Sequence, residues 1–310
     1  MSPPRSVMSW LPLVLGLGAS GCPSFPMREV VVRLDAGTMG TSSGTSHSAR
    51  GALRFSVAAI QSPSGTYLGY SRLLEHLGRK LGRDIELVQR SSYRETNALL
   101  LAGQTDVAFI CTGGYLYLER ESPGLVEVLA VPVIRGQTTY QSLTIVPASS
   151  PVRRIAELAG KRVAFTDELS FTGRLYLVFN VHALGLQPER FFSSAIFTQG
   201  HDRSIEAVAR GFVDAAAVDS NIFYRVTEDT PGLAGQVRVL DVSPPFGVPP
   251  VVALKSLRPD QRARLAEAFL SLDGDPEGAL LLKALGIDRF VAPPANLYDS
   301  AALVLSGLGR

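Results

Sequence analysis

The chain has 310 residues, of which 46% are hydrophobic and 19% are charged, and its formal net charge is +2. A chain of this length is too long for one small hydrophobic core and suits two lobes of ordinary domain size. The small net charge, without a long run of one sign, argues against a nucleic-acid-binding protein, which would show clustered arginine and lysine residues.

The N-terminal residues 1–21 have the pattern of a signal peptide. Arg5 supplies a short positive region, the apolar stretch 7–17 follows, and small residues at 19–21 precede Cys22. The apolar run is too short to span a bilayer, and small residues directly before a cysteine are similar to a bacterial lipobox. We therefore expect export and a lipid anchor through Cys22 on the periplasmic side of a bacterial membrane. The alternative is a plain secretory signal, which also exports the chain.

A flexible, lipid-anchored tether is predicted for residues 22–50. Its segment 37–46 is rich in glycine, serine and threonine, a composition typical of flexible linkers. The valine run 30–32 does not fit this pattern, and the sequence suggests no role for it.

After the tether, short apolar runs alternate with amphipathic stretches, and glycines end most of the predicted helices. The first round of strands and helices comprises residues 55–58, 68–81, 85–88, 93–102, 106–110, 129–134 and 142–146. The second round comprises residues 155–158, 162–165, 173–184, 195–197, 204–210, 214–218 and 237–242, before a helical tail from 259. Such alternation predicts sheets with helices on both faces, and two rounds predict two lobes.

The expected fold class is therefore α/β, with two lobes that are each a parallel-rich sheet flanked by helices. Lobe 1 is predicted to comprise residues 51–144 and 248–310, and lobe 2 residues 145–247. We expect hinge crossings near Leu143–Pro147 and near Ser243–Pro250, the second of which contains four prolines.

The first candidate site follows the strand at 162–165, because ligands of such sheets bind near the carboxyl ends of strands. Ser170 and Thr172 are natural N-cap residues of the next helix. Their hydroxyls, together with free backbone N–H groups as far as Gly173, would form an anion site that the helix dipole supports. The alternative is a simple helix cap.

Two further segments follow strands. His201 opens a helix, where its imidazole would donate to an oxyanion whose charge favours the protonated form, although an ordinary cap-region residue is the alternative. Cys111 and Thr112 precede the glycines 113–114, which would allow close backbone approach to a ligand. We expect Cys111 to be a buried small hydrophobic residue, since no base is positioned to activate it.

The order of these motifs resembles the phosphate-, phosphite- and phosphonate-binding proteins of ABC importers, which have the type II periplasmic binding-protein fold. The resemblance covers about residues 53–275. Its most specific part is the pair Ser170-Phe171-Thr172-Gly173 and Phe197-Thr198-Gln199-Gly200-His201. Weaker matches lie at residues 92–93, 102–109, 139–142, 157–165, 207–215 and 243–245.

The resemblance implies that a phosphorus oxyanion lies between the serine–threonine loop, the histidine after glycine, and tyrosines of the first lobe. Carried over residue by residue, this set is Ser170, Thr172, His201, Tyr93 and Tyr140. The anion would be a phosphonate, phosphite or phosphate.

The sequence departs from the family pattern at residues 111–112 and at Phe171, and Asp219 is a further candidate that we do not match to the pattern. Cys111 and Thr112 stand where Gly-Pro is usual, and we keep Thr112 as a candidate ligand residue. Asp219 follows a predicted strand and would face the cleft. Phe171 replaces a hydroxyl residue; it would either pack against an organic substituent of the ligand or turn into the lobe core, the alternative that we favour.

Together these features predict a monomeric solute-binding lipoprotein that closes about its hinge and docks on an ABC permease. The sequence shows no Ser-His-Asp or Cys-His catalytic set and no spacing typical of metal ligands. We therefore expect no catalysis, no metal and no cofactor. The alternatives are an orphan or sensory binding lipoprotein for another small anion, such as a sulfonate or carboxylate, and an enzyme on this fold.

Overall fold

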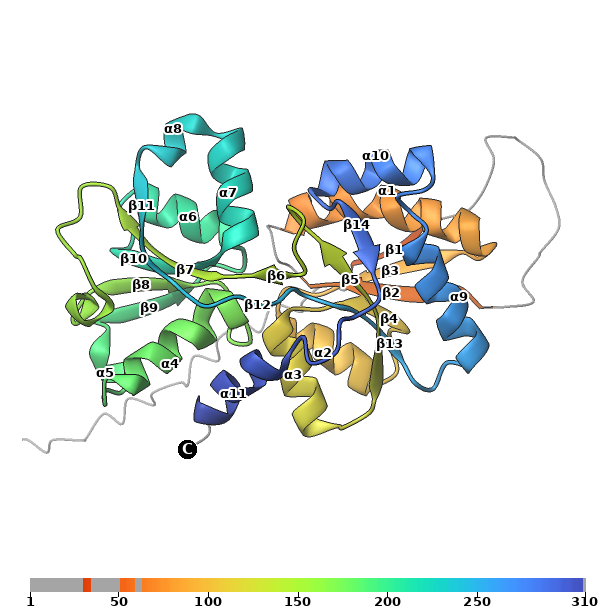
Figure 1. The fold of residues 1–310 in the computed structure, drawn as a ribbon, viewed down its shortest axis with the longest axis horizontal. Coiled ribbons are helices and arrows are strands. Elements are labelled where there is room, and N and C mark those ends of the chain that lie inside the picture. Colours follow the sequence, from red (N-terminus) through yellow and green to blue (C-terminus); the bar gives the residue numbers. More distant parts are fainter. Residues whose placement is uncertain (1–29, 35–50, 59–62, 309–310) are drawn as a thin grey trace, which may run out of the picture.

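Two sheets joined by a narrow crossing form the computed structural model, which describes residues 30–34, 51–58 and 63–308 (Figure 1). The predicted signal segment 1–21, Cys22 and most of the predicted tether lie outside the described residues. Among the described residues, none of the helices combines the length and the apolar character that a membrane span requires.

Lobe 1 is built on a seven-stranded sheet in the order β1-β3-β2-β4-β13-β5-β14. Its strands are β1 (Val30–Leu34), β2 (Leu53–Val57), β3 (Ile85–Gln89), β4 (Val107–Phe109), β5 (Val126–Val133), β13 (Val251–Leu254) and β14 (Arg289–Val291). Strand β1 contains the valine run inside the segment predicted as a tether, and it pairs antiparallel with β3. Its β-branched residues suit a strand.

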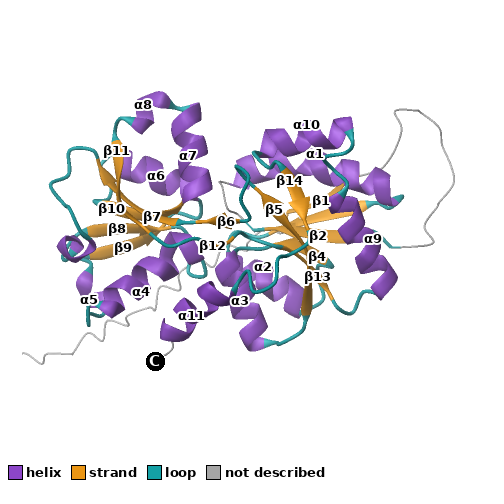
Figure 2. Ribbon diagram, viewed as in Figure 1, coloured by secondary structure: helices purple, strands orange, loops and turns teal. Residues whose placement is uncertain are grey.

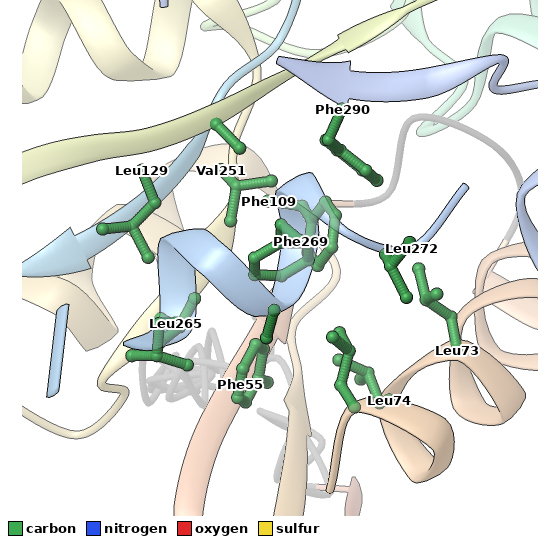
Figure 3. Packing of buried hydrophobic residues seen from close by; sticks show 14 of the residues in the cluster. Phe55, Leu73, Leu74, Phe109, Leu129, Val251, Leu265, Phe269, Leu272 and Phe290 are labelled. Atoms are coloured by element: carbon green, nitrogen blue, oxygen red, sulfur yellow. The ribbon is translucent and has the colours of Figure 1, made fainter. Parts of the chain in front are cut away.

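Helices cover both faces of this sheet. On one face lie α1 (Pro63–Leu81), α9 (Pro259–Leu270) and α10 (Pro276–Leu285), and on the other α2 (Tyr93–Leu101) and α3 (Thr112–Glu121). Between the sheet and the first group, Phe109 and Phe290 each pack edge-on against Phe269, with ring centroids 5.6 Å and 5.3 Å apart (Figure 3).

Lobe 2 is built on a five-stranded sheet in the order β11-β7-β10-β8-β9. Its strands are β7 (Ser142–Pro147), β8 (Arg162–Phe165), β9 (Ser194–Phe197), β10 (Ala215–Asp219) and β11 (Val237–Val242). One face carries α4 (Tyr176–Ala183) and α5 (Pro188–Phe191), and the other α6 (His201–Ala209), α7 (Ser220–Asp229) and α8 (Pro231–Ala234) (Figure 2). A 3₁₀ turn, η1 (Ile155–Leu158), precedes β8, and a π-helical turn, η2 (Phe171–Leu175), precedes α4.

The two-lobed α/β prediction is confirmed, but both sheets are mixed and not parallel-rich. Three parallel strands lie together in each sheet, β3-β2-β4 and β10-β8-β9, and the remaining pairs are antiparallel. Part of the mixture arises where the chain changes lobe, because β7 and β13 enter their sheets from the crossing and run against their neighbours.

The crossing is a short antiparallel pair, β6 (Thr139–Tyr140) and β12 (Phe246–Gly247), which places Tyr140 opposite Phe246. The second crossing segment thus falls where the prolines of 243–250 predict it. The first lies earlier than predicted, since residues 143–147 belong to β7 inside the lobe 2 sheet. Leu143 and Ile145 are fully buried there, which fixes this segment to lobe 2.

The C-terminal helix α11 (Asp299–Leu308) lies across both lobes, against α3 of lobe 1 and α4 of lobe 2 (Figure 1). Its buried residues Ala301, Val304 and Leu305 belong to an apolar cluster that also contains Phe171 of lobe 2 and Phe246 of the crossing. We call this group the pivot cluster. It packs the crossing between the two lobes.

Candidate functional site

Ser170 and Gly173 shape the anion loop that follows β8. Ser170 caps η2, and its Oγ accepts a hydrogen bond from the Gly173 N–H at 3.0 Å, which leaves its own hydroxyl proton free to donate. A Cβ on Gly173 would collide with Thr166 Oγ1 and would lie 2.6 Å from Ser170 Oγ. Glycine is therefore required at position 173, because the side chains of Thr166 and Ser170 leave no room for a Cβ.

Three hydroxyl groups meet beside this loop. The Thr172 and Thr112 hydroxyls lie near that of Tyr140, but neither is within hydrogen-bond geometry of it. Thr112 Oγ1 donates to the Gly247 carbonyl at 2.8 Å, so its own proton is engaged with the crossing. The Thr172 carbonyl accepts from Ser142 Oγ at 2.7 Å, which fixes the turn to the start of β7.

Tyr93 and Tyr140 bring two phenol groups to the junction. Both side chains are buried, and neither hydroxyl has a hydrogen-bond partner among the described residues. Burial raises both pKa values well above the usual range, and the neighbouring Cys111 and Asp219 add to the shift, so both phenols stay protonated and can donate. An unsatisfied buried hydroxyl costs about 1–3 kcal/mol, so an acceptor brought between these groups would be stabilised.

His201 is held as a neutral imidazole with a defined tautomer. Its Nδ1 accepts the backbone N–H of Asp219 at 3.0 Å, and the Thr166 hydroxyl lies 3.0 Å from the same atom. The ring proton must therefore be on Nε2, which makes no hydrogen bond to any other described residue. Burial lowers the His201 pKa to about 3. The backbone donor at Nδ1 thus holds the imidazole neutral, whereas we expected from the sequence that a bound anion would favour the protonated form.

Asp219 ends β10 and caps α7. Its Oδ1 accepts from the backbone N–H groups of Asn221 at 2.7 Å and Ile222 at 3.3 Å. The carboxyl group is buried, which raises its pKa to about 6. Asp219 therefore serves as a cap and, through its backbone, as the group that orients His201.

The loop of lobe 2 also contacts lobe 1 directly. The Tyr93 N–H donates to Asp167 Oδ2 at 3.1 Å, and Arg94 forms an exposed ion pair with Glu168 at 3.3 Å. A Cβ on Gly113 would collide with the Leu169 carbonyl oxygen. The glycines at 113–114 were expected to admit a ligand; instead, Gly113 admits the backbone of the opposite lobe.

A second set of contacts joins the lobes on the far side of the crossing. Arg225 of α7 donates to the Leu285 carbonyl at 3.0 Å, and Arg135 pairs with Glu228. The lobes thus contact each other on both sides of the crossing, and we call this the closed arrangement.

Phe171 lies in the pivot cluster. Its side chain is fully buried, and its ring packs edge-on against Phe246 with centroids 4.7 Å apart. Phe171 is therefore buried, but in the pivot cluster between the lobes and not in the core of lobe 2.

Sequence reasoning missed three supporting residues, Ser142, Thr166 and Asp167. Each is buried and bonds to a candidate ligand residue. Thr166 and Asp167 directly follow β8, so their position at a strand end was the available signal. Among the described residues, no group of three or more His, Cys, Asp or Glu side chains is placed to hold a metal ion.

The pKa of Asp219 predicts a pH-dependent stability difference between the wild type and Asp219→Asn. Asparagine keeps the cap but cannot titrate. Because the folded pKa is about 6 against an ordinary 3.8, the folded wild type takes up a proton before the unfolded chain does as the pH falls from about 6 to 4. The wild type should therefore gain up to about 3 kcal/mol relative to the variant over this range.

Urea unfolding at pH 4, 5, 6 and 7 measures this difference. His201→Gln is a control for which the opposite change is expected. The pKa of His201 in the folded wild type lies below the ordinary 6.5, so the wild type should lose stability relative to His201→Gln as the pH falls below about 6.5. Parallel pH profiles for the wild type and Asp219→Asn would contradict the assignment of a buried, titrating Asp219.

Comparison with known proteins was consistent across sequence and structure. The family described as "ABC transporter, phosphonate, periplasmic substrate-binding protein" matches residues 55–298. The phosphate-import protein PhnD of Mycolicibacterium smegmatis is 31% identical over 171 residues, which cover 51% of this chain and 53% of that protein. The aligned part thus spans about half of the relative's length.

Two solved structures share the fold. PhnD1 of Prochlorococcus marinus, in complex with methylphosphonate, superposes with a TM-score of 0.74 at 16% identity, covering 83% of this chain and 98% of that one. A binding protein component of an ABC phosphonate transporter from Pseudomonas aeruginosa also gives 0.74, at 19% identity, covering 82% and 85%. The chain has the type II periplasmic binding-protein fold, and it belongs to the family of periplasmic substrate-binding proteins of phosphonate ABC transporters, which bind solutes and are not enzymes.

Proposed function

We propose that this protein captures a phosphorus oxyanion between its lobes and delivers it, as a monomer, to an ABC permease. The observation that carries the proposal is the pair of buried, unpartnered hydroxyls of Tyr93 and Tyr140, of which that of Tyr140 lies near the Thr172 hydroxyl. An anion with several oxygens would accept from both phenols, from Ser170 and Thr172, and from His201 Nε2. Hydrogen bonds to a charged acceptor are the stronger kind.

Asp219 favours phosphorus over sulfur in the ligand. Its buried carboxyl group, with a pKa raised to about 6, would accept a proton from a P–OH group or share one with it. A sulfonate is fully ionised near neutral pH and offers no such proton. The family membership supports the same ligand class, which includes phosphonate, phosphite and phosphate.

Removing a single donor tests this site. Tyr140→Phe and Thr172→Val should each weaken binding of methylphosphonate, phosphite or phosphate about tenfold to a hundredfold, since a hydrogen bond to a charged group contributes about 1.5–3 kcal/mol. Calorimetry measures the affinities, with methanesulfonate as the competing anion and the half-exposed Tyr224→Phe as a matched control.

Unfolding experiments separate loss of a ligand contact from loss of structure. Because the Tyr140 hydroxyl has no partner, Tyr140→Phe should not destabilise the ligand-free protein. Unchanged affinity in both variants, or a preference of the wild type for methanesulfonate, would overturn the proposal.

Gly113→Ala tests whether binding needs the closed arrangement. The new Cβ would meet the Leu169 carbonyl, a backbone atom that cannot turn aside. Overpacking of this kind costs about 1–3 kcal/mol, so ligand affinity should fall about tenfold or more. Small-angle scattering should show compaction on ligand addition for the wild type and a smaller change for the variant.

Gly232→Ala is the matched control, because a Cβ there meets no atom within 4 Å. It should bind and compact like the wild type. Equal compaction and affinity in Gly113→Ala would show that the closed arrangement is not the binding state.

The lipid anchor at Cys22 is the last part of the proposal. It lies outside the described residues and is supported by the small residues before Cys22 and by the periplasmic family. Cys22→Ser should move the protein from the membrane fraction to the soluble fraction, whereas Cys111→Ser, at the buried cysteine, should remain membrane-bound. Mass spectrometry of the N-terminal peptide identifies the acyl groups, and a soluble, unacylated wild type would contradict the anchor.

A further inference from the structure

The valine run 30–32, for which the sequence suggests no role, lies in the strand β1. This strand (Val30–Leu34) pairs antiparallel with β3 over five residue pairs, from Val30 opposite Gln89 to Leu34 opposite Ile85 (Figure 1). It completes one edge of the lobe 1 sheet, where β3 would otherwise present unpaired N–H and C=O groups. The match to the family begins at residue 55, so β1 is a feature of this chain outside the matched region.

Docking of β1 divides the segment predicted as a tether into two parts. Seven residues, 23–29, lie between Cys22 and Val30. The sixteen residues 35–50, which include the glycine-, serine- and threonine-rich stretch 37–46, connect β1 to the region of β2 in the same sheet. That stretch therefore joins two parts of lobe 1 and does not lengthen the path from the anchor to the lobe.

The shorter path limits the distance between β1 and a lipid anchor at Cys22. A fully extended chain spans at most about 3.6 Å per residue, so the eight steps from Cys22 to Val30 reach about 29 Å. A path that ran on to Gly51 would have 29 steps and would reach about 100 Å. As flexible chains, the two paths would have root-mean-square lengths of about 16 Å and about 30 Å. The docked strand thus halves the mean distance between the anchor and lobe 1.

The antiparallel register decides which end of the lobe 1 sheet the path from the anchor reaches. Val30 lies opposite Gln89, the last residue of β3, and the chain then passes through Ser92 into α2. Tyr93, the first residue of α2, is a proposed ligand donor. Ile85, at the other end of β3, lies about 13 Å farther along the strand. The path therefore reaches lobe 1 at the end of the sheet from which α2 and the candidate site follow.

We propose that β1 is a docking strand that shortens the lipid tether and orients the anchored protein, with the α2 end of the lobe 1 sheet toward the bilayer surface. The inference rests on the proposed function, since the lipid anchor at Cys22 belongs to it. Rotation of the lobe that carried Val30 away from the bilayer would have to stretch the short path. Without the docked strand, the tether would enter at Gly51, next to Leu53 and hence at the Ile85 end of β3.

Hydrogen exchange tests the strand in the soluble Cys22→Ser protein, where acylation plays no part. In an antiparallel pair, the N–H groups of neighbouring residues point alternately toward and away from the partner strand. Val31→Pro/Val32→Pro therefore removes one N–H group that faces β3, whichever of the two it is. The β3 amides that bond to β1 should then exchange about tenfold faster or more, because β1 no longer protects them.

Two further variants control this experiment. Ser42→Pro/Ser43→Pro places the same prolines in the glycine-, serine- and threonine-rich stretch and should leave exchange of the β3 amides unchanged. Val31→Gly/Val32→Gly weakens the strand without proline and should speed exchange of the same amides. Unchanged β3 exchange in both valine variants would overturn the inference.

Energy transfer to an acceptor on the lipid head groups tests the orientation, on vesicles that carry the acylated protein. A donor is attached either at Ser91→Cys, near the α2 end of β3, or at Asp84→Cys, next to Ile85, in a Cys111→Ser background. Both labelled positions are exposed. Transfer from position 91 should exceed that from position 84 about twofold, since the two ends of β3 are about 13 Å apart.

In Val31→Pro/Val32→Pro, which keeps Cys22, this difference in transfer should be lost, because the tether then enters at the opposite end of the sheet. Equal transfer from the two positions with β1 intact would overturn the inference. An unacylated wild type would instead overturn the anchor in the proposed function, while the exchange experiment on Cys22→Ser would still decide whether β1 is docked.

Discussion

Closing the lobes removes water from more polar groups than the protein itself can satisfy. The hydroxyls of Tyr93 and Tyr140 are buried without a partner among the described residues. Each unsatisfied group costs about 1–3 kcal/mol, and this cost opposes the closed arrangement. Under the proposed function, an anion that accepts from these hydroxyls would remove the cost and would couple binding to closure.

The donors can have this effect only if they are held in position before the ligand arrives. Ser142 and Thr166 bond to the Thr172 carbonyl and to His201 Nδ1, and Asp167 accepts from the backbone of Tyr93. Asp219 connects these parts, because it caps α7 and its backbone orients His201. The site is thus preorganised by buried side chains that need not touch the ligand.

Local patterns in the sequence predicted what depends on local structure. Alternating strands and helices indicated the two-lobed α/β fold, and the strand-end rule drew attention to Ser170, Thr172 and His201. Non-local contacts were not predictable in this way. The protonation of His201 depends on a backbone N–H at Asp219, and the role of Gly113 depends on a loop of the other lobe. The first crossing was misplaced because a fully buried strand and an apolar hinge look alike in sequence.

The replacement of a hydroxyl residue by Phe171 follows from the way the lobes are joined. Its ring packs on Phe246 of the crossing, and the cluster continues to α11, which contacts both lobes and begins just after the region that matches the family. Phe171 lies between Ser170 and Thr172, so the two hydroxyl residues of the anion loop are attached directly to the pivot cluster. In place of one hydroxyl residue, an apolar contact ties Ser170 and Thr172 to the crossing between the lobes.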